Sequence, residues 1–533
     1  MRVTPDEWVR VTIFAVVVMA LTCVPYALAV VNTPNGWQYS GFVLASDDSF
    51  SYVGKMRQGL EGYWSFHIFY TAEPHEAAPL TLLAYIAPGQ FMRLYTGTDN
   101  PALFNQMLWL FHGMRVVLGV LQILVVYRLV AVFIEQAGAR FMATLIITVG
   151  GGLGILLLPF NETPPEWFIP EAFSFLGMLT LPHLVLGRLT LLAGVVLLLN
   201  SGPRSDGPLR HAVFAGAMWV LTGLTVPFYL AVLYVVLGVW GILLWVRNRA
   251  FPMPLFIRAV IAGGITLPVF FYYVWLFSAN SAMAQWSSQN LLPAPPVWHY
   301  ALSYGPVVLA GAFAVRSAWR NPDERYLLLL AWSFAGLMLV YLPINVQRRL
   351  GEGVFVALGI LAVMGVSRLM QSDSGELRRR WLRPALLVTT LPTMLFLLVV
   401  TSLGVMAAPR DLYTETSTIE ALQWLDENDV SGEERGAAVL SRFSVGTRLP
   451  VYAALRSYVG HGPETLNSGE KKTLAEAFFD GALSADEATA LVTDPENYID
   501  YVFVGVGDVL PDGVDDLLTE VHREGEIVIY AVE

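Results

Sequence analysis

Long apolar runs separated by short polar segments fill the first three quarters of the chain. A helix needs roughly 20 apolar residues to cross the hydrocarbon core of a membrane. About eleven runs approach or exceed that length, at residues 11–31, 101–134, 140–159, 172–200, 211–225, 227–246, 257–279, 299–315, 326–344, 352–370 and 384–408. Only Thr225-Val226-Pro227 divides the fifth run from the sixth, so they form a tight hairpin or one of them is re-entrant. We predict an all-α polytopic membrane bundle of about 11 transmembrane helices.

Composition supports a membrane protein and excludes several other classes. Of the 533 residues, 55% are hydrophobic and 14% are charged, whereas soluble domains carry about 25% charged residues. A basic stripe is absent from the sequence, so nucleic acid is not an expected partner. The single cysteine, Cys23, lies in the first apolar run and excludes an intrachain disulfide or a cysteine-based metal site. That run lacks a small-residue cleavage site, and we expect it to be a retained helix.

Positive charges predict the orientation of the chain. Cytoplasmic loops carry an excess of Lys and Arg, and alternate loops here are rich in arginine, with Arg10, Arg140, Arg210, Arg249 and Arg320 among them. The segment 280–298, in contrast, contains no Lys or Arg. We therefore expect a multi-pass protein of the cytoplasmic (plasma) membrane with a cytoplasmic amino terminus and an extracytoplasmic carboxyl terminus. Arg348 and Arg349 break this pattern, because they fall on the outer side.

Two outer segments concentrate acidic side chains. The long loop 32–100 contains the adjacent carboxylates of Asp47 and Asp48, and further along it His75 and Glu76. Residues 79–95 of this loop are amphipathic and predict a helix lying in the membrane interface. The segment 160–171 carries two more candidates, Glu166 and Glu171. Paired carboxylates next to a span bind water, a metal ion or a protonatable substrate, although a solvated acidic loop has the same composition.

After Pro409 the chain becomes acidic and polar, and strand and helix patterns alternate. We predict strands at 436–441, 457–460, 498–506 and 526–532, and helices at 412–428, 446–455, 468–480, 484–493 and 514–523. Such alternation is typical of an α/β domain with a partly parallel sheet. The expected division is a transmembrane domain, 1–408, which includes the loop 32–100, and a soluble extracytoplasmic α/β domain, 409–533.

The order of these features resembles the GT-C glycosyltransferases, in particular the protein-mannosyltransferase and aminoarabinose-transferase branch. Asp47-Asp48 stand where this family has an acidic motif in its first external loop. The segment Pro74-His75-Glu76-Ala77-Ala78-Pro79-Leu80 is similar to the His-Pro-Pro-Leu-type stretch that opens an interface helix, but an Ala pair replaces part of it. A second segment, 456–465, resembles a Gly-His-x-x-Glu-Thr element of large bacterial membrane proteins without assigned activity.

The resemblance implies a transferase that takes a sugar from a polyprenyl-phosphate donor to a glycan, lipid or protein acceptor. It implies that Asp47 or Asp48 is the general base, and that Asp48 holds a divalent cation, Mg or Mn. Substrate-binding roles would fall to His75, Glu76, Glu166 and Glu171. Arg348 and Arg349 would bind the lipid phosphate, since guanidinium groups match phosphate oxygens bidentately; snorkelling to headgroups or an ion pair with Glu352 is the structural alternative.

Two other functions remain open from the sequence. A non-catalytic transporter or flippase for lipid-linked saccharides would have the same apolar spans, but such proteins usually show internal repeats and ionisable residues within the spans. An assembly protein whose α/β domain is the active part would also fit. The sequence specifies neither the sugar nor the acceptor.

Overall fold

The computed structural model describes residues 2–200, 209–371, 376–429 and 436–532, and these residues form two compact units. The first, which we call the bundle unit, comprises Met1–Pro25, His112–Val274 and Leu291–Leu403. The second, the loop–sheet unit, comprises Tyr26–Phe111, Trp275–Asn290 and Gly404–Glu533. The loop–sheet unit therefore combines the long first loop with the C-terminal region. The predicted domain boundary at residue 408 stays a prediction.

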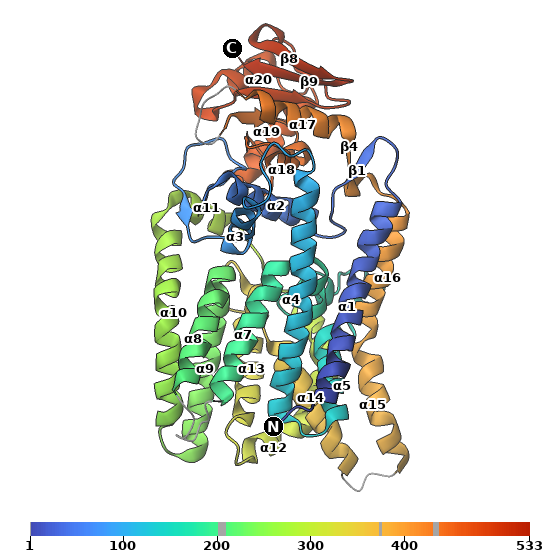
Figure 1. Cartoon of the computed structure of the whole chain (residues 1–533), viewed down its shortest axis with the longest axis vertical. Coiled ribbons are helices and arrows are strands. Elements are labelled where there is room, and N and C mark those ends of the chain that lie inside the picture. Colours follow the sequence, from blue (N-terminus) through green and yellow to red (C-terminus); the bar gives the residue numbers. More distant parts are fainter. Residues whose placement is uncertain (1, 201–208, 372–375, 430–435, 533) are drawn as a thin grey trace. The chain divides into compact units, whose positions relative to one another are not determined.

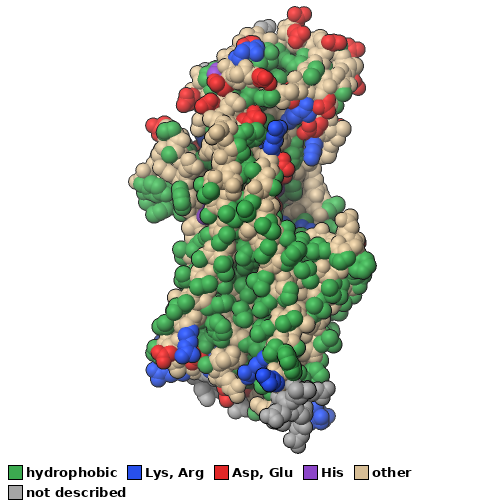
Figure 2. Space-filling view, turned by 90° about the vertical axis from the view of Figure 1, so that its right-hand side faces the viewer, with side chains coloured by type: hydrophobic (Ala, Val, Ile, Leu, Met, Phe, Trp, Pro, Cys, Tyr) green, Lys and Arg blue, Asp and Glu red, His purple; other side chains and the backbone are tan. Residues whose placement is uncertain are grey.

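The protein is a polytopic helical bundle with a C-terminal domain that contains a small sheet (Figure 1). In the described part of the chain, nine helical segments are long and apolar enough to cross a membrane: Pro5–Val31, Leu103–Phe133, Ala137–Phe160, Pro182–Asn200, Phe228–Asn248, Met253–Ala279, Val297–Arg320, Gln347–Gln371 and Arg380–Met406. Figure 2 shows hydrophobic side chains covering the displayed face of the bundle, with Lys and Arg gathered at one end. Such a surface is compatible with lipid.

Two of the eleven predicted spans are helices that are too short by themselves. Helix α8 (Arg210–Thr225) has 16 residues and α13 (Tyr326–Leu339) has 14, which correspond to about 24 and 21 Å of helix against a core of about 30 Å. Their status as spans stays a prediction. The run 172–200 also divides, into α6 (Ser174–Thr180) and α7 (Pro182–Asn200), because Pro182 has no N–H to continue the first helix.

Several helices of the bundle unit pack in neighbouring pairs. Helix α12 (Val297–Arg320) lies against α14 (Val354–Gln371), α7 against α8, and α9 (Phe228–Asn248) against α13. Helix α5 (Ala137–Val149) packs against α14. The short 3₁₀ helices η1 (Gly154–Phe160) and η2 (Pro165–Trp167) contact α12, and η3 (Gln347–Gly351) contacts α13. Helices α15 (Glu376–Thr390) and α16 (Pro392–Met406) follow.

Helix α2 (Ser46–Glu61) is the central element of the loop–sheet unit. It packs against α3 (Leu83–Met92), the ten-residue helix found where an interface helix was expected at 79–95. The two helices meet at glycines: a Cβ on Gly59 would lie 2.1 Å from the carbonyl oxygen of Ile86, and one on Gly89 would lie 1.9 Å from that of Met56. Any side chain at these two positions would separate the backbones. Asp47 and Asp48, expected in a loop, lie instead in the first turn of α2.

The C-terminal region contains a five-stranded sheet with the order β6-β5-β7-β9-β8. Strand β5 (Ala438–Leu440) pairs in parallel with β6 (Arg456–Ser457) and β7 (Tyr501–Val504), while β9 (Ile527–Val532) pairs antiparallel with β7 and with β8 (Leu518–Glu524). This confirms the predicted partly parallel sheet. Its helices are α17 (Thr416–Asn428), α18 (Phe443–Tyr452), α19 (Ser468–Phe479) and α20 (Ala485–Thr493).

The helix predicted at 514–523 is wrong. Residues Asp515–Leu517 form a short 3₁₀ turn, and Leu518–Glu524 is an edge strand that returns into β9 through Gly525, whose φ is 62°. Only its first residue is buried and a register shift interrupts it near His522, so the apolar alternation that marks a strand is absent.

Smaller pairings complete the unit. Strand β1 (Trp37–Tyr39) pairs antiparallel with β4 (Tyr413–Glu415), which connects the first loop to the segment entering the C-terminal region. Strands β2 (Ser65–Phe66) and β3 (Ala78–Pro79) close a hairpin within the loop. Helix α11 (Ser281–Gln289) also belongs to this unit.

Candidate active site

Helix α2 is mostly buried and carries three polar side chains of interest along one face. Asp48, Ser51 and Lys55 are spaced three and four residues apart, which places them on the same side of an α-helix. Asp47 is exposed and the side chain of Asp48 is 47% exposed, whereas Ser51 and Lys55 are buried. The amino-terminal end of a helix favours negative charge. The carboxylates thus lie at the open end of this face and the lysine at its buried end.

Lys55 is a fully buried cation surrounded by aromatic rings. Its Nζ lies 5.2 Å from the ring centre of Tyr52, 5.1 Å from that of Phe66 and 5.7 Å from that of Phe69. Glu464, from the C-terminal region, pairs with it at 2.7 Å. Burial lowers the pKa of Lys55, while the carboxylate of Glu464 opposes that shift. An ammonium ion buried among rings is costly unless it is paired, so Glu464 is needed to keep it.

His461 lies between Asp48 and Glu464, the carboxylate that pairs with Lys55. Its Nε2 lies 3.2 Å from Oδ1 of Asp48 and its Nδ1 lies 3.4 Å from Oε1 of Glu464. Burial alone would lower the pKa of His461, but the two carboxylates outweigh burial and raise the pKa to about 9. The imidazole is therefore protonated at neutral pH, with Nε2–H donating to Asp48.

Glu464 contacts Ser51, Lys55 and His461. Its Oε1 accepts hydrogen bonds from Ser51 Oγ at 2.8 Å and from Lys55 Nζ. Burial would raise the pKa of Glu464, but Lys55 and His461 lower it to about 2. Its Oε2 is buried and has no hydrogen-bond partner among the described residues. The negative charges of Asp48 and Glu464 therefore balance the positive charges of Lys55 and His461. We name this group of residues, Asp48, Ser51, Lys55, His461 and Glu464, the open cluster.

His75 and Glu76 occupy the same unit but not this cluster. His75 Nε2 accepts the backbone N–H of Ile68 at 2.9 Å, and Nδ1 lies 2.9 Å from the carbonyl oxygen of Glu73. The ring thereby closes the loop that precedes β3. The side chain of Glu76 is exposed, and its carbonyl accepts from Asn280 at 3.1 Å. Substrate binding by this pair stays a prediction.

Glu166 lies in the interior of the bundle unit. Its carboxyl group accepts hydrogen bonds from the backbone N–H of Gly152 and Gly154, at 3.0 and 3.2 Å, and from Ser303 Oγ at 2.8 Å. Burial raises the pKa of Glu166 although these hydrogen bonds oppose the shift. The observed role is to hold the turn after α5; a substrate-binding role stays a prediction.

The arginine pair lies in η3 of the bundle unit, next to the other predicted glutamate. Arg349 Nε is 3.4 Å from Oε1 of Glu171, and its guanidinium lies 5.5 Å from the ring centre of Phe228. Arg348 lies 5.3 Å from the ring centre of Phe168. Both arginines are partly exposed, and such guanidinium groups remain within reach of an anion.

Glu352, the ion-pair partner expected for Arg348 and Arg349 in the structural alternative, binds Arg188. Its Oε1 and Oε2 accept from Nε and Nη2 of Arg188 at 2.6 and 2.7 Å, and Nη2 also donates to the carbonyl oxygens of Pro170 and Glu171 at 2.9 and 2.6 Å. We name Arg188 and Glu352, with those two carbonyl groups, the closed pair. The predicted ion pair of the arginines with Glu352 is therefore wrong, and Arg349 is paired with Glu171 instead.

The structure brings together some predicted residues and adds others. Asp48 lies beside His461 and Glu464, and Arg349 lies beside Glu171. The carboxylates of Asp47 and Asp48 belong to the loop–sheet unit and the arginines to the bundle unit. Ser51 and Lys55 lie in the same stretch of sequence as Asp48, but they were not predicted as site residues. Their signal was present as polar positions at helical spacing behind Asp48.

The expectation that Asp48 holds a divalent cation stays a prediction. No group of three or more His, Cys, Asp or Glu side chains in the part of the chain that the structure describes is placed to hold an ion. The ring of His461 beside Asp48 can act as a metal ligand only in its neutral form. We derive no step through a metal.

Comparisons with known proteins place this geometry in a fold family. No protein-family model matches the sequence, and no curated protein matches it. Solved structures do match. The oligosaccharyltransferase of Archaeoglobus fulgidus in the apo form aligns with 92% of this chain and 69% of its own, at 13% identity and a TM-score of 0.55. The same organism's AglB in complex with an inhibitory peptide and a dolichol-phosphate gives the same coverage and score at 12% identity.

A third structure matches over nearly the whole length of both chains. ArnT from Cupriavidus metallidurans bound to undecaprenyl phosphate aligns with 99% of this chain and 98% of its own, at 15% identity and a TM-score of 0.52. These neighbours are membrane glycosyltransferases of the GT-C type. The chain has the GT-C fold.

Proposed function

We propose that this protein is a membrane glycosyltransferase that moves a sugar from a polyprenyl-phosphate donor to an acceptor on the extracytoplasmic face. The observation that carries the proposal is the half-exposed carboxylate of Asp48, held against the protonated ring of His461 in the first turn of α2. The full-length match to ArnT, whose structure contains undecaprenyl phosphate, supports the donor class.

The proposed chemistry needs few protein groups. The acceptor hydroxyl attacks the anomeric carbon with inversion, the bond from that carbon to the phosphate oxygen breaks, and polyprenyl phosphate leaves with the bonding electrons. Asp47 or Asp48 takes the hydroxyl proton as general base, an effect typically worth about 10²- to 10⁴-fold in rate. Arg348 and Arg349 bind the phosphate that leaves.

The transporter alternative has one supporting observation. Arg188 and Glu352 are ionisable side chains within two of the membrane-crossing segments, a feature typical of coupled transport. Every oxygen of that carboxylate is already bonded and an arginine keeps its proton at any working pH. The pair therefore suits structural support better than ion coupling.

The test is a transfer assay on the purified full chain in detergent with synthetic polyprenyl-phosphate sugars. We expect the Asp47→Asn/Asp48→Asn variant to bind the lipid phosphate normally and to lose transfer by about 10²-fold or more. Arg348→Ala/Arg349→Ala should weaken lipid binding. Glu520→Gln, an exposed glutamate on β8, is the matched control. Transfer at the wild-type level after the double aspartate change would reject the site, and flipping of the lipid without transfer would favour the transporter.

A further inference from the structure

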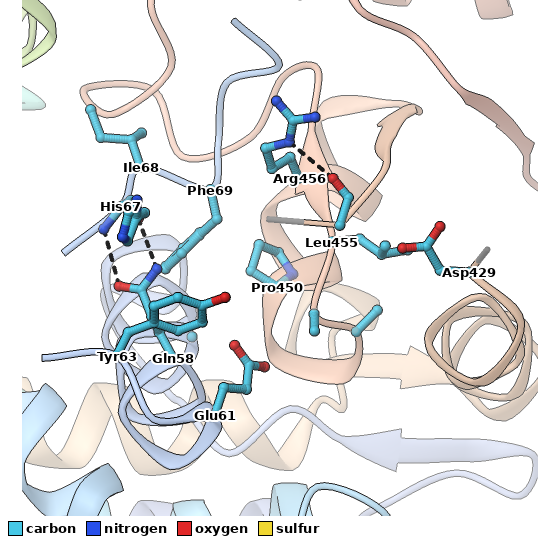
Figure 3. Close-up of a pocket in the computed structure, with 14 residues that line it drawn as sticks. Gln58, Glu61, Tyr63, His67, Ile68, Phe69, Asp429, Pro450, Leu455 and Arg456 are labelled. Atoms are coloured by element: carbon cyan, nitrogen blue, oxygen red, sulfur yellow. Dashed lines mark hydrogen bonds between the residues drawn. The ribbon is translucent and has the colours of Figure 1, made fainter. Parts of the chain in front are cut away.

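A cavity of about 280 Å³ opens within the loop–sheet unit along the carboxyl-terminal half of α2 (Figure 3). One wall is the carboxyl-terminal half of α2 and the loop that follows it, and the other is the end of α18 with the turn into β6. Small-molecule sites usually begin near 300 Å³, and a water molecule takes about 30 Å³. The space therefore suits a ligand of the size of one sugar ring.

The lining combines an apolar floor with a few polar groups that converge. Phe69, Pro450 and Leu455 provide apolar surface. In Figure 3 the phenol of Tyr63 and the carboxylate of Glu61 point into the space. This mixture matches a sugar ring, which has C–H faces and a rim of hydroxyl groups. Aromatic rings cover such faces and carboxylates accept from such hydroxyls.

Glu61 is the polar group best placed for recognition. Its side chain is 18% exposed, and its Oε1 accepts from Arg57 Nε at 2.9 Å. Burial raises the pKa of this carboxyl group, while Arg57 opposes the shift. A perturbed carboxyl group in a cavity is a common mark of a binding site. Arg57 fixes it in place, so it is pre-organised.

The other polar groups set the walls and the charge of the cavity. The side-chain amide of Gln58 donates to and accepts from the backbone of His67, at 3.2 Å each, and so fixes the loop wall. Arg456 donates to the carbonyl oxygens of Gly436 and Ala72. Asp429 adds a second carboxylate to the lining. The lining arginine, Arg456, already donates to two carbonyl oxygens and Arg57 is paired with Glu61, so the described lining disfavours an anionic ligand.

We infer that this cavity binds one neutral saccharide unit, with the Glu61 carboxylate accepting hydroxyl hydrogens and the Tyr63 ring covering a C–H face. Asp48 and Glu61 are thirteen positions apart on α2, about 20 Å along the axis at 1.5 Å per residue. A single sugar cannot reach both. The unit bound here is therefore not the sugar being transferred, and its assignment to a glycan acceptor rests on the proposed function.

Binding is measured directly, without transfer, by saturation-transfer NMR on the full chain in detergent. The probes are neutral methyl glycosides of hexoses and pentoses, each with its uronic acid counterpart where one exists. We expect Glu61→Gln to weaken binding of the neutral glycoside by about tenfold. Ala454→Trp, at an exposed position of the rim, should fill the cavity and remove binding. Tyr95→Leu and Glu520→Gln, both exposed and outside the lining, are the controls.

The outcomes separate this inference from the proposed function. Binding of a neutral glycoside that both changes reduce, and that the uronic acid competes for poorly, supports the inference even if no donor lipid is turned over. Absence of binding to every glycoside, or binding that survives either Glu61→Gln or Ala454→Trp, overturns it even if transfer is active. Preference for the uronic acid also overturns it.

Discussion

The open cluster and the closed pair are both buried sets of opposite charges, but they differ in how completely they are bonded. In the closed pair both oxygens of Glu352 accept from Arg188, which also donates to two backbone carbonyls. In the open cluster Glu464 has a buried oxygen without a hydrogen-bond partner among the described residues, and Asp48 is 47% exposed. Buried polar groups whose hydrogen bonds are all satisfied stabilise a single arrangement, whereas groups with an unsatisfied hydrogen-bonding atom can still bind a ligand.

The largest expected effect tests the closed pair. Arg188→Met leaves Glu352 buried without its counter-charge, and breaking a buried pair in this way typically costs about 3–5 kcal/mol. We expect a large fall in the midpoint of thermal unfolding in detergent. Because the cost comes from the orphaned carboxylate, Arg188→Met/Glu352→Leu should recover much of the loss. Arg247→Met, in a partly exposed pair with Glu324, is the control. A double variant no more stable than the single one would contradict this account.

The second prediction concerns pH, to which the open cluster should respond, whereas the arginine of the closed pair keeps its charge. The pKa of His461 is about 9 when folded against 6.5 ordinarily, so its stabilisation is complete below pH 6.5 and disappears as pH rises through 9. The pKa of Glu464 is about 2 against 4.5, so its contribution is complete above pH 4.5 and disappears as pH falls through 2.

Stability should therefore have a plateau between about pH 4.5 and 6.5, followed by an alkaline decline on the order of 3 kcal/mol from His461. His461→Gln removes the titrating ring, and we expect the alkaline decline to become shallower in thermal unfolding curves measured from pH 6 to 9.5. His522→Gln, a partly buried histidine stacked on Trp424, should keep the decline. Equal slopes for the wild type and His461→Gln would show that this ring is not protonated in the fold.

The third prediction is kinetic. Loss of the charged hydrogen bond from His461 to Asp48, a contact worth about 1.5–3 kcal/mol, should lower kcat of transfer in His461→Gln by about tenfold. KM should change little, because the ring positions the base and does not touch the donor. His522→Gln is again the control. A change confined to KM would place His461 in substrate binding instead.

The sequence predicted the membrane bundle and the parallel part of the sheet because both depend on local patterns. Apolar runs mark spans wherever lipid is the solvent, and the apolar strands β5 and β7 follow turn signals. The edge strand β8 has no apolar alternation, so Leu518–Glu524 was taken for a helix. The intrinsic strand propensity of a segment is a weak predictor where pairing with a neighbouring strand decides the conformation.

The site was predictable only in part for a related reason. Asp47 and Asp48 are visible as adjacent carboxylates, and the segment with His461 and Glu464 is visible as a motif. Their meeting joins positions more than 400 residues apart, as the Ser51–Glu464 hydrogen bond does. No period or spacing encodes such a contact. Likewise, the partner of Arg349 was sought three residues away at Glu352 and is found at Glu171.

The smallest expected effect concerns the ion pair of Arg349 and Glu171, which is only partly buried. Arg349 is 31% exposed at its side chain and lies 3.4 Å from Glu171, so a lipid phosphate would have to compete with that carboxylate. Glu171→Gln removes the competing charge. We expect stability to change by less than about 1 kcal/mol and binding of polyprenyl phosphate to tighten by about two- to fivefold, since a partly exposed ion pair is worth about 0.2–1 kcal/mol.

The control for this last change is Glu162→Gln, a half-exposed glutamate of the same segment that lies 3.9 Å from His299. It should leave lipid binding unchanged. Tighter binding in Glu171→Gln that disappears when Arg349→Ala is added would show that the phosphate and Glu171 share one guanidinium. Unchanged binding in Glu171→Gln would mean that Arg349 serves the fold alone, as Arg188 does, and would leave Arg348 as the remaining phosphate ligand of η3.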